Sequence, residues 1–297
     1  MRKAPFSCGL VIAGFVLTFL QPVALASTVF IDDFSVVKNG TTIFHDPFED
    51  NAPPPVAPNF TNGNPASYFV SGTLEEASGK VTLNDVGAAI VPGVGAPGFF
   101  FFEEARLLTN IDPEDLDAGL KNDDTFSVTG IFDLVVPAAS REFYGVRFTD
   151  TTQTAEGNDR LNLAVRRGAD GVDRVQFFRL DATADTFTSF AAALLEPGHD
   201  QISLTLARTS ATSNAITSSF FYIDGGAPGS TTTFINTADI FNGENWTRAA
   251  FVFAAPVPEP SSLLLLGAGL AGLAALSRRR YAGLTCPCRR SRPRPGR

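Results

Sequence analysis

Residues 125–136 read TFSVTGIFDLVV, and this stretch decides the fold. Its apolar or small residues recur at every second position, at Phe126, Val128, Gly130, Phe132, Leu134 and Val136. Most positions between them are polar, namely Thr125, Ser127, Thr129 and Asp133. A period of two is the period of a β-strand that buries one face and exposes the other. The stretch therefore predicts a long strand on the surface of a core.

Segments with the same character follow along the chain. Strands are predicted at residues 28–37, 66–72, 80–84, 144–148, 161–165, 175–180, 202–206 and 220–223. Turn-forming residues lie between them at 156–159, 168–171, 196–198 and 224–226. No amphipathic helix longer than two turns is predicted, although residues 112–120 favour a short one. Strands at this spacing predict an all-β fold, an antiparallel β-sandwich.

The succession of strands from 126 to 226 resembles the concanavalin-like (laminin-G-like) jelly-roll superfamily. The likeness rests on the segments YGVRF (144–148), LNLAV (161–165) and SFFYIDGG (219–226). It implies two curved antiparallel sheets whose concave face often binds saccharide. The superfamily includes lectins, glucanases and purely adhesive domains, so the fold does not choose among these functions.

The N-terminus has the pattern of a secretory signal peptide. Arg2 and Lys3 precede an apolar region at 6–20, and small residues follow at Ala24 and Ala26. Residues 1–26 are predicted to be removed by signal peptidase before Ser27, after passage through the export translocon. Cys8 follows Phe6-Ser7 and stands at the start of the apolar region instead of after it, so lipidation is not predicted.

The C-terminus carries a second, three-part pattern. Pro258-Glu259-Pro260 is predicted to be stiff and non-helical, because proline fixes its own φ and extends the preceding residue. An uncharged run at 261–277 is predicted to be a single transmembrane helix, although about 16 apolar or small residues is short for a bilayer that needs about 20. Arg278-Arg279-Arg280 would mark its cytoplasmic side. The alternative is a buried core helix, which the abrupt arginine stop disfavours.

This tail resembles the PEP-CTERM sorting signal of Gram-negative bacteria. The resemblance covers residues 257–280 and implies a substrate of an exosortase-type membrane transpeptidase. Such enzymes are thought to cut near Pro-Glu-Pro and to move the protein to the surface or into exopolysaccharide. The chain continues to Arg297 where such tails usually stop, and residues 281–297 are predicted to form a disordered basic tail. This extension is either a cytoplasmic tail or an artefact of the gene end, and it puts the efficiency of processing in doubt.

The expected organisation is therefore a signal peptide at 1–26, an exported domain at 27–255, a sorting signal at 256–280 and the basic tail. The exported domain contains no cysteine, which excludes disulfides and thiol chemistry there. It holds 30 of the 31 Asp and Glu but only 13 of the 23 Lys and Arg, giving a net charge of −17. A field of that sign repels phosphate backbones, so nucleic-acid binding is not expected.

No catalytic residue is predicted. The carboxylates cluster as adjacent pairs, at Asp32-Asp33, Glu75-Glu76, Glu103-Glu104 and Asp123-Asp124. Adjacent residues of a strand point to opposite faces, so such pairs are not acid–base dyads. Only His45 and His199 offer a base for a serine nucleophile, and both are expected on loop surfaces. The chain is therefore not expected to be an enzyme, with a secreted glycan-active enzyme as the alternative.

No cofactor is predicted, and one metal site is considered. Asp32 and Asp33 open the domain, and with loop carbonyls they are candidates for a structural calcium site. The more ordinary interpretation is that these carboxylates are solvated at the end of a strand.

The function predicted is that of a cell-surface or matrix module, structural or exopolysaccharide-binding, that is held at the inner membrane until processed. Candidate saccharide contacts are Tyr144, Trp246, Arg147, Arg166 and Arg174. The more ordinary interpretation, core aromatics and solvated charges of a sheet face, is favoured. Four consecutive phenylalanines at 99–102 predict either burial in a second layer, which is favoured, or an exposed contact patch.

Overall fold

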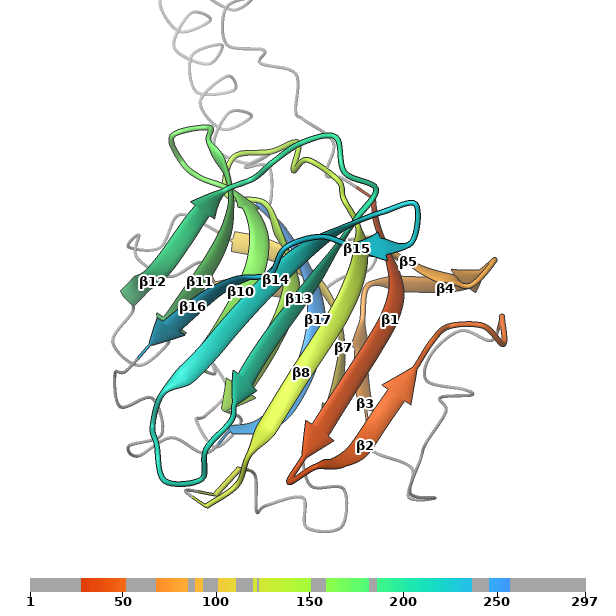
Figure 1. Ribbon diagram of the computed structural model, residues 1–297. Coiled ribbons are helices and arrows are strands. Elements are labelled where there is room, and N and C mark those ends of the chain that lie inside the picture. Colours follow the sequence, from red (N-terminus) through yellow and green to blue (C-terminus); the bar gives the residue numbers. More distant parts are fainter. Residues whose placement is uncertain are drawn as a thin grey trace, which may run out of the picture. The chain divides into compact units, whose positions relative to one another are not determined.

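A computed structural model describes residues 28–51, 68–84, 89–92, 101–110, 120–121, 123–150, 159–181, 186–236 and 246–256 (Figure 1). All of them belong to the first of the two units into which the chain divides, Met1–Val257 and Pro258–Arg297. The predicted signal peptide, transmembrane helix and basic tail lie outside the described residues. So does the predicted short helix, apart from its last residue, Leu120. Within the described ranges no helix is long and apolar enough to cross a membrane.

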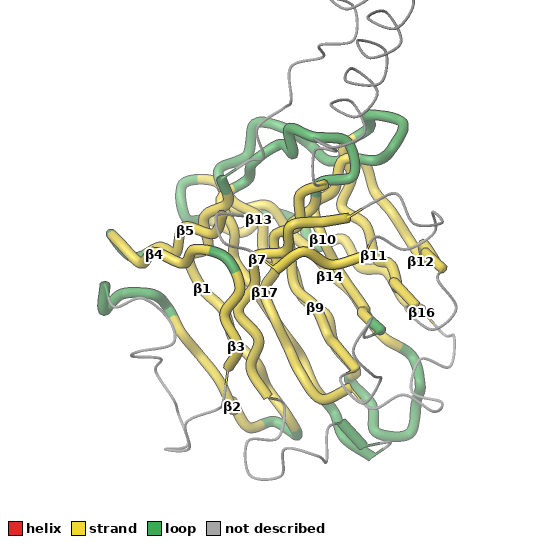
Figure 2. Tube along the Cα trace, turned by 180° about the vertical axis from the view of Figure 1, so that it is seen from behind, coloured by secondary structure: helices red, strands yellow, loops and turns green. Residues whose placement is uncertain are grey.

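The described residues form two antiparallel sheets, as expected for a β-sandwich (Figures 1 and 2). The nine-stranded sheet has the order β15-β14-β13-β8-β1-β5-β4, with β16 beside β14 and β2 beside β1. Its strands are β1 (Val29–Lys38), β2 (Thr41–Asp46), β4 (Thr73–Ala77), β5 (Lys80–Asn84), β8 (Phe126–Asp133), β13 (Gln201–Arg208), β14 (Ile216–Asp224), β15 (Ala227–Pro228) and β16 (Thr232–Asn236).

The eight-stranded sheet has the order β12-β11-β10-β9-β17-β7-β3, with β6 beside β7. Its strands are β3 (Tyr68–Ser71), β6 (Ala89–Pro92), β7 (Phe101–Asn110), β9 (Phe143–Asp150), β10 (Arg160–Arg167), β11 (Asp173–Asp181), β12 (Thr186–Leu194) and β17 (Trp246–Pro256). The last strand, β17, lies inside the sheet between β9 and β7, so the fold is closed by residues immediately before the predicted sorting signal.

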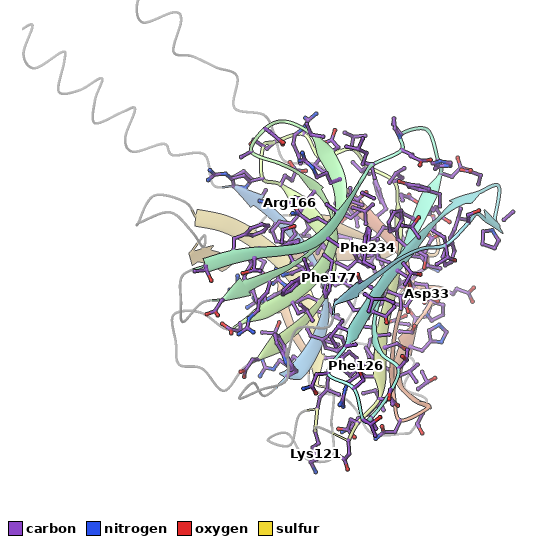
Figure 3. The ribbon with its side chains drawn as sticks, turned by 60° about the vertical axis from the view of Figure 1, so that its left-hand side comes forward. Asp33, Lys121, Phe126, Arg166, Phe177 and Phe234 are labelled. Atoms are coloured by element: carbon purple, nitrogen blue, oxygen red, sulfur yellow. The ribbon has the colours of Figure 1, made fainter. Side chains whose placement is uncertain are left out.

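The main core lies between the two sheets, and the alternating residues of 126–132 build one side of it. Phe126, Val128 and Phe132 of β8 are buried there, while the residues between them are half-exposed. Aromatic side chains from both sheets meet edge to face, with ring centroids 4.4 Å apart for Phe126 and Phe148. Figure 3 shows Phe126 and Phe177 among the side chains of this interior. The two-sheet sandwich is confirmed, and its assignment to the jelly-roll type stays a prediction.

Close packing within the eight-stranded sheet depends on Gly145 in β9. A Cβ at this position would lie 2.2 Å from the carbonyl oxygen of Leu163 and 2.7 Å from the Cα of Ala164, both in the neighbouring strand β10. Those are backbone atoms, which cannot move aside without disturbing the strand pairing. Glycine therefore lets β9 and β10 approach each other at this point.

Candidate binding face

The outer face of the eight-stranded sheet, which points away from the nine-stranded sheet, concentrates arginine side chains. Strands β7, β9, β10, β11 and β17 send their alternate apolar residues into the main core, for example Leu107, Val146 and Leu163. The residues between them face outward and bring together Arg106, Arg147, Arg160, Arg166, Arg174 and Arg248. We call this surface the arginine face. It holds six of the thirteen cationic residues of the predicted exported domain.

The centre of the arginine face is a buried ionic cluster around Glu104. The Nη1 atom of Arg147 is hydrogen-bonded to Glu104 Oε1, and Arg106 Nη1 lies 3.2 Å from the same oxygen. Arg160 Nη1 lies 3.4 Å from Glu104 Oε2. Arg147 also donates through Nε to Asn162 Oδ1 at 2.6 Å. The side chains of Arg147 and Glu104 are 0% and 1% exposed, so this ion pair is inside the protein.

Burial of several guanidinium groups together has an electrostatic cost. Burial, and then the charge of Arg160, hold the pKa of Arg147 well below its usual range. Burial, and then the charge of Arg106, lower the pKa of Arg160 to about 10. Breaking such a cluster by removing one partner is strongly destabilising, because it leaves a buried charge uncompensated. Glu104 is therefore needed to hold these arginines in place.

A second, more accessible group lies toward β12, at the edge of the same sheet. The guanidinium carbon of Arg166 lies 4.5 Å from the ring centroid of Phe187 and 5.5 Å from that of Phe178. Its Nη1 donates to Gln176 Oε1 at 2.9 Å, and Gln176 Nε2 donates to Ser189 Oγ at 2.8 Å. We call these five residues the Arg166 platform; Figure 3 labels Arg166. Arg166 and Phe187 are half-buried, and Ser189 is exposed.

Three of the five predicted saccharide contacts lie on this face, and two do not. Arg147, Arg166 and Arg174 share the outer face because they stand at outward positions of β9, β10 and β11. Tyr144 and Trp246 are instead buried in the main core, so their favoured interpretation as core aromatics is confirmed and the contact role is wrong for them. Tyr144 lies two residues before Val146 and four before Phe148, which both face inward. At a period of two, Tyr144 therefore faces inward as well.

The hydroxyl group of Tyr144 has a structural role that its sequence position did not reveal. It accepts a hydrogen bond from the backbone N–H of Val135 at 3.0 Å and donates to the carbonyl oxygen of the same residue at 2.9 Å. Burial raises the pKa of Tyr144. The side chain thus ties β9 to the segment that follows β8.

The adjacent carboxylates behave as expected in one strand and differently in another. In β4, Glu75 is exposed while Glu76 is buried. Asp123 is exposed and Asp124 is buried, but this pair precedes β8 and lies outside any strand. At Asp32-Asp33, however, the β1–β8 register shifts by one residue, so that Asp32 is the extra residue of a β-bulge. Asp32 and Asp33 are both half-exposed as a result, and the expectation of opposite faces fails there.

The candidate calcium ligands are engaged by other side chains. Asp32 Oδ1 lies 3.3 Å from Lys80 Nζ, and Asp32 also accepts a hydrogen bond from Gln201. Asp33 Oδ2 lies 2.9 Å from His45 Nε2. Across the described ranges, no three His, Cys, Asp or Glu side chains are arranged to hold a metal ion. The carboxylates of this strand are thus used in ion pairs.

The two histidines lie in different settings. His199 lies on the loop before β13, as predicted, where its ring stacks on Tyr222 with centroids 4.2 Å apart. Its Nδ1 lies 2.7 Å from Asp224 Oδ2, and this hydrogen bond raises the pKa of His199. His45 lies within strand β2, so the expectation of a loop is wrong for it.

Comparison with known proteins addresses the C-terminal pattern directly. Residues 256–280 match the PEP-CTERM protein-sorting motif. The resemblance inferred from the tail is therefore confirmed, and the motif implies export, processing by an exosortase and sorting to the cell surface. The individual roles of Pro258, Glu259, Pro260 and Arg278-Arg279-Arg280, and cleavage after Ala24-Leu25-Ala26 before Ser27, stay predictions.

Two further comparisons concern the rest of the chain. No curated protein matches the sequence at a significant level. Among solved structures, the CBM2 module of the evolved Dit protein of Lactobacillus casei BL23 phage J-1 is similar at a TM-score of 0.40 and 10% identity. The similarity covers 75% of this chain and 88% of that one.

Proposed function

We propose that this chain is an exported protein whose tail is processed by an exosortase-type transpeptidase, and that its β-sandwich then acts at the cell surface or in the extracellular matrix. In this proposal the sandwich is a non-catalytic module, structural or exopolysaccharide-binding. The observation that carries the proposal is the match of residues 256–280 to the sorting motif.

The position of the motif relative to the last strand supports this proposal. Strand β17 ends at Pro256 and pairs on both sides, with β9 and with β7, over most of its length. Cleavage at Pro258-Glu259-Pro260 would fall after this strand, so every described strand would remain in the released product. A cut inside β17 would instead open the middle of the eight-stranded sheet. Cleavage at the motif would therefore remove no described strand from the sandwich.

The arginine face supports the saccharide-binding form of the proposal. Guanidinium and hydroxyl groups donate hydrogen bonds, and Arg166 and Ser189 offer such groups beside an aromatic ring, held by the buried Gln176 that bonds to both. A few polar groups placed beside aromatic side chains are the usual composition of a small-molecule site. This part of the proposal rests on the platform alone.

The enzyme alternative finds less support on the same face. A glycosidase needs two carboxyl groups within reach of one glycosidic bond. On the described outward positions of β7, β9, β10 and β17, the carboxylate is Glu104, and Arg147, Arg106 and Arg160 surround it. Such a carboxylate is committed to its ion pairs.

A polysaccharide array tests the binding form and the enzyme alternative together. The full-length protein is incubated with immobilised neutral and acidic polymers, and both retained protein and released sugar are measured. Retention without release of sugar is expected. Release of sugar from any polymer would replace the proposed module by an enzyme.

A further inference from the structure

The charge of the arginine face is opposite to that of the domain that carries it. The predicted exported domain has a net charge of −17, yet six of its thirteen cations lie on one face of one sheet. Like charges repel, so gathering them there works against folding unless anions are supplied. Within the cluster Glu104 is one anion, and it faces three guanidinium groups.

The Arg166 platform also carries more positive than negative charge, at a more exposed position. Arg174 is paired with Asp170, whose Oδ2 lies 2.6 Å from Arg174 Nη2. Arg166 itself is held by a neutral amide and by two aromatic rings, and no carboxylate among the described residues lies within ion-pair distance of it. Burial, and then the charges of Arg141 and Arg174, lower the pKa of Arg166 to about 10. An anion bound beside Arg166 would offset this repulsion.

The chemistry of the surrounding residues points to the class of anion. Guanidinium groups match the geometry of carboxylate and sulfate-type oxyanions through paired N–H donors. Ser189 is an exposed hydroxyl that can meet a sugar hydroxyl, and the buried Gln176 is hydrogen-bonded to both Arg166 and Ser189. Phe187 offers a half-buried ring beside Arg166. An oxyanion carried on a polyhydroxylated ring matches all of these groups.

We infer that the Arg166 platform binds an anionic saccharide, a residue bearing a carboxylate or a sulfate ester within an acidic polysaccharide. This inference rests on the proposed function and names its ligand class. Arg166 supplies the charged donors, Ser189 meets a hydroxyl group, and Phe187 contacts the apolar side of the sugar ring. The buried Gln176 orients Arg166 and Ser189 through its hydrogen bonds to both. Because the domain as a whole repels polyanions, attraction to one must come from a local site.

Three polymers separate the possibilities when the full-length protein, in detergent for its apolar tail, is titrated with each. Dextran is neutral, dextran sulfate is the same backbone with sulfate esters, and polygalacturonate carries carboxylates. We expect binding to at least one of the two anionic polymers to be tenfold or more tighter than to dextran, and to weaken as salt is added. The preferred polymer tells whether the site takes a sulfate or a carboxylate.

A pair of variants on one strand then locates the site. Arg166→Gln is expected to weaken binding of the anionic polymer by roughly tenfold, the usual effect of losing a charged hydrogen bond. Arg167→Gln removes the same charge from the next residue, whose Nε lies 3.1 Å from Asp173 Oδ1, and is expected to leave binding unchanged. Arg174→Gln, at a more exposed side chain, is expected to weaken binding by less than Arg166→Gln and guards against misfolding of the first variant.

The outcomes separate failure of this inference from failure of the proposed function. Binding of dextran as tight as the binding of both anionic polymers, or equal loss in the Arg166 and Arg167 variants, would overturn the inference while leaving a saccharide-binding module. Binding to none of the three polymers would overturn the inference and leave only the structural form of the proposed function. Thermal melting of each variant, compared with the parent, shows that the fold is intact.

Discussion

Strands β8 and β9 follow one another in the chain but bury their residues differently. In β8 (Phe126–Asp133) burial alternates at every position, so one face lies in the core and the other is half-exposed. In β9 (Phe143–Asp150) all eight residues are buried. The outer residues of β8 include Thr129, whose hydroxyl group lies 3.0 Å from that of Thr205. The outer residues of β9 include Arg147, inside the ionic cluster.

The difference shows that a period of two gives the direction of a side chain and not its exposure. Both strands send alternate residues into the same core. The outer side of β9 belongs to a second buried layer, in which Phe143, Ala164, Phe178, Val252 and Ala254 pack together beside the arginines. Polar residues in that layer need partners, whereas the hydroxyls of β8 can be hydrated.

The largest expected effect comes from removing Glu104, the anion of the second buried layer. Glu104→Ala would leave Arg147 buried without its carboxylate and is expected to lower the free energy of unfolding by about 3–5 kcal/mol. Urea denaturation of the purified protein measures this. Glu75→Ala, at an exposed glutamate of β4, is the matched control and should change stability by less than about 0.5 kcal/mol. Equal losses in the two variants would show that the cluster is not a buried ionic unit.

Gly145 of β9 and Gly130 of β8 have different neighbours. A Cβ at Gly145 of β9 meets backbone atoms of β10, whereas a Cβ at Gly130 of β8 meets ring atoms of Phe132 at 2.7 Å and 2.9 Å. A side chain can shift and a paired backbone cannot, so Gly145→Ala should cost about 3 kcal/mol and Gly130→Ala about 1 kcal/mol. Melting of both variants tests the order, and a larger loss at Gly130 would contradict the close approach of β9 and β10.

Tyr144 tests the inner side of β9. Tyr144→Phe removes the two hydrogen bonds to the backbone of Val135 and is expected to cost about 1–2 kcal/mol. Because the ring lies in the core, this variant should bind polysaccharide as the parent does. Reduced binding at unchanged stability would restore Tyr144 as a contact residue.

The smallest effect is expected at His199, which lies on an exposed loop before β13 and pairs with Asp224. The hydrogen bond to Asp224 raises the pKa of His199, so the folded state favours the protonated ring. Its stabilising contribution is complete below the pKa of histidine in the unfolded chain and is lost as the pH rises through the raised value. Asp224→Asn should return the pKa of His199 toward its ordinary value, as followed by NMR titration of the ring. An unchanged titration would show that the pair does not form in solution.

Much of the nine-stranded sheet could be predicted from local pattern. The period-two stretches at 202–206 and 220–223 fall in β13 and β14, and the first eight residues of the stretch 126–136 form β8, which ends at Asp133. Burial alternates along β8, whereas β13 also buries Ser203 and Ala207 between its apolar positions. Strand β12 (Thr186–Leu194) was not predicted, since it lies at a sheet edge where both faces are partly exposed and alternation is lost. Phe101 and Phe102 open β7, but their side chains lie outside the description, so burial of that run stays a prediction.

The candidate site was predicted only in part for a related reason. Arg147, Arg166 and Arg174 were singled out because their strands were recognised. Three further arginines share the arginine face. Arg106 and Arg248 join it through the pairing of β7 and β17, which are distant in the sequence. Arg160 joins it because β10 begins at that residue. Register between distant strands is not carried by any local pattern. Charge alternating with apolar residues in 104–107 was the one available signal for β7.

Export and processing at both ends are tested by the intact mass of the protein recovered from the surface or matrix of the cells that make it. We expect a chain that begins at Ser27 and ends within the segment 256–260, with the sandwich whole. We also expect that changing Pro258-Glu259-Pro260 to alanines keeps the tail attached. Recovery of all 297 residues, with both ends uncut, from the soluble cell interior would contradict export and sorting of this protein.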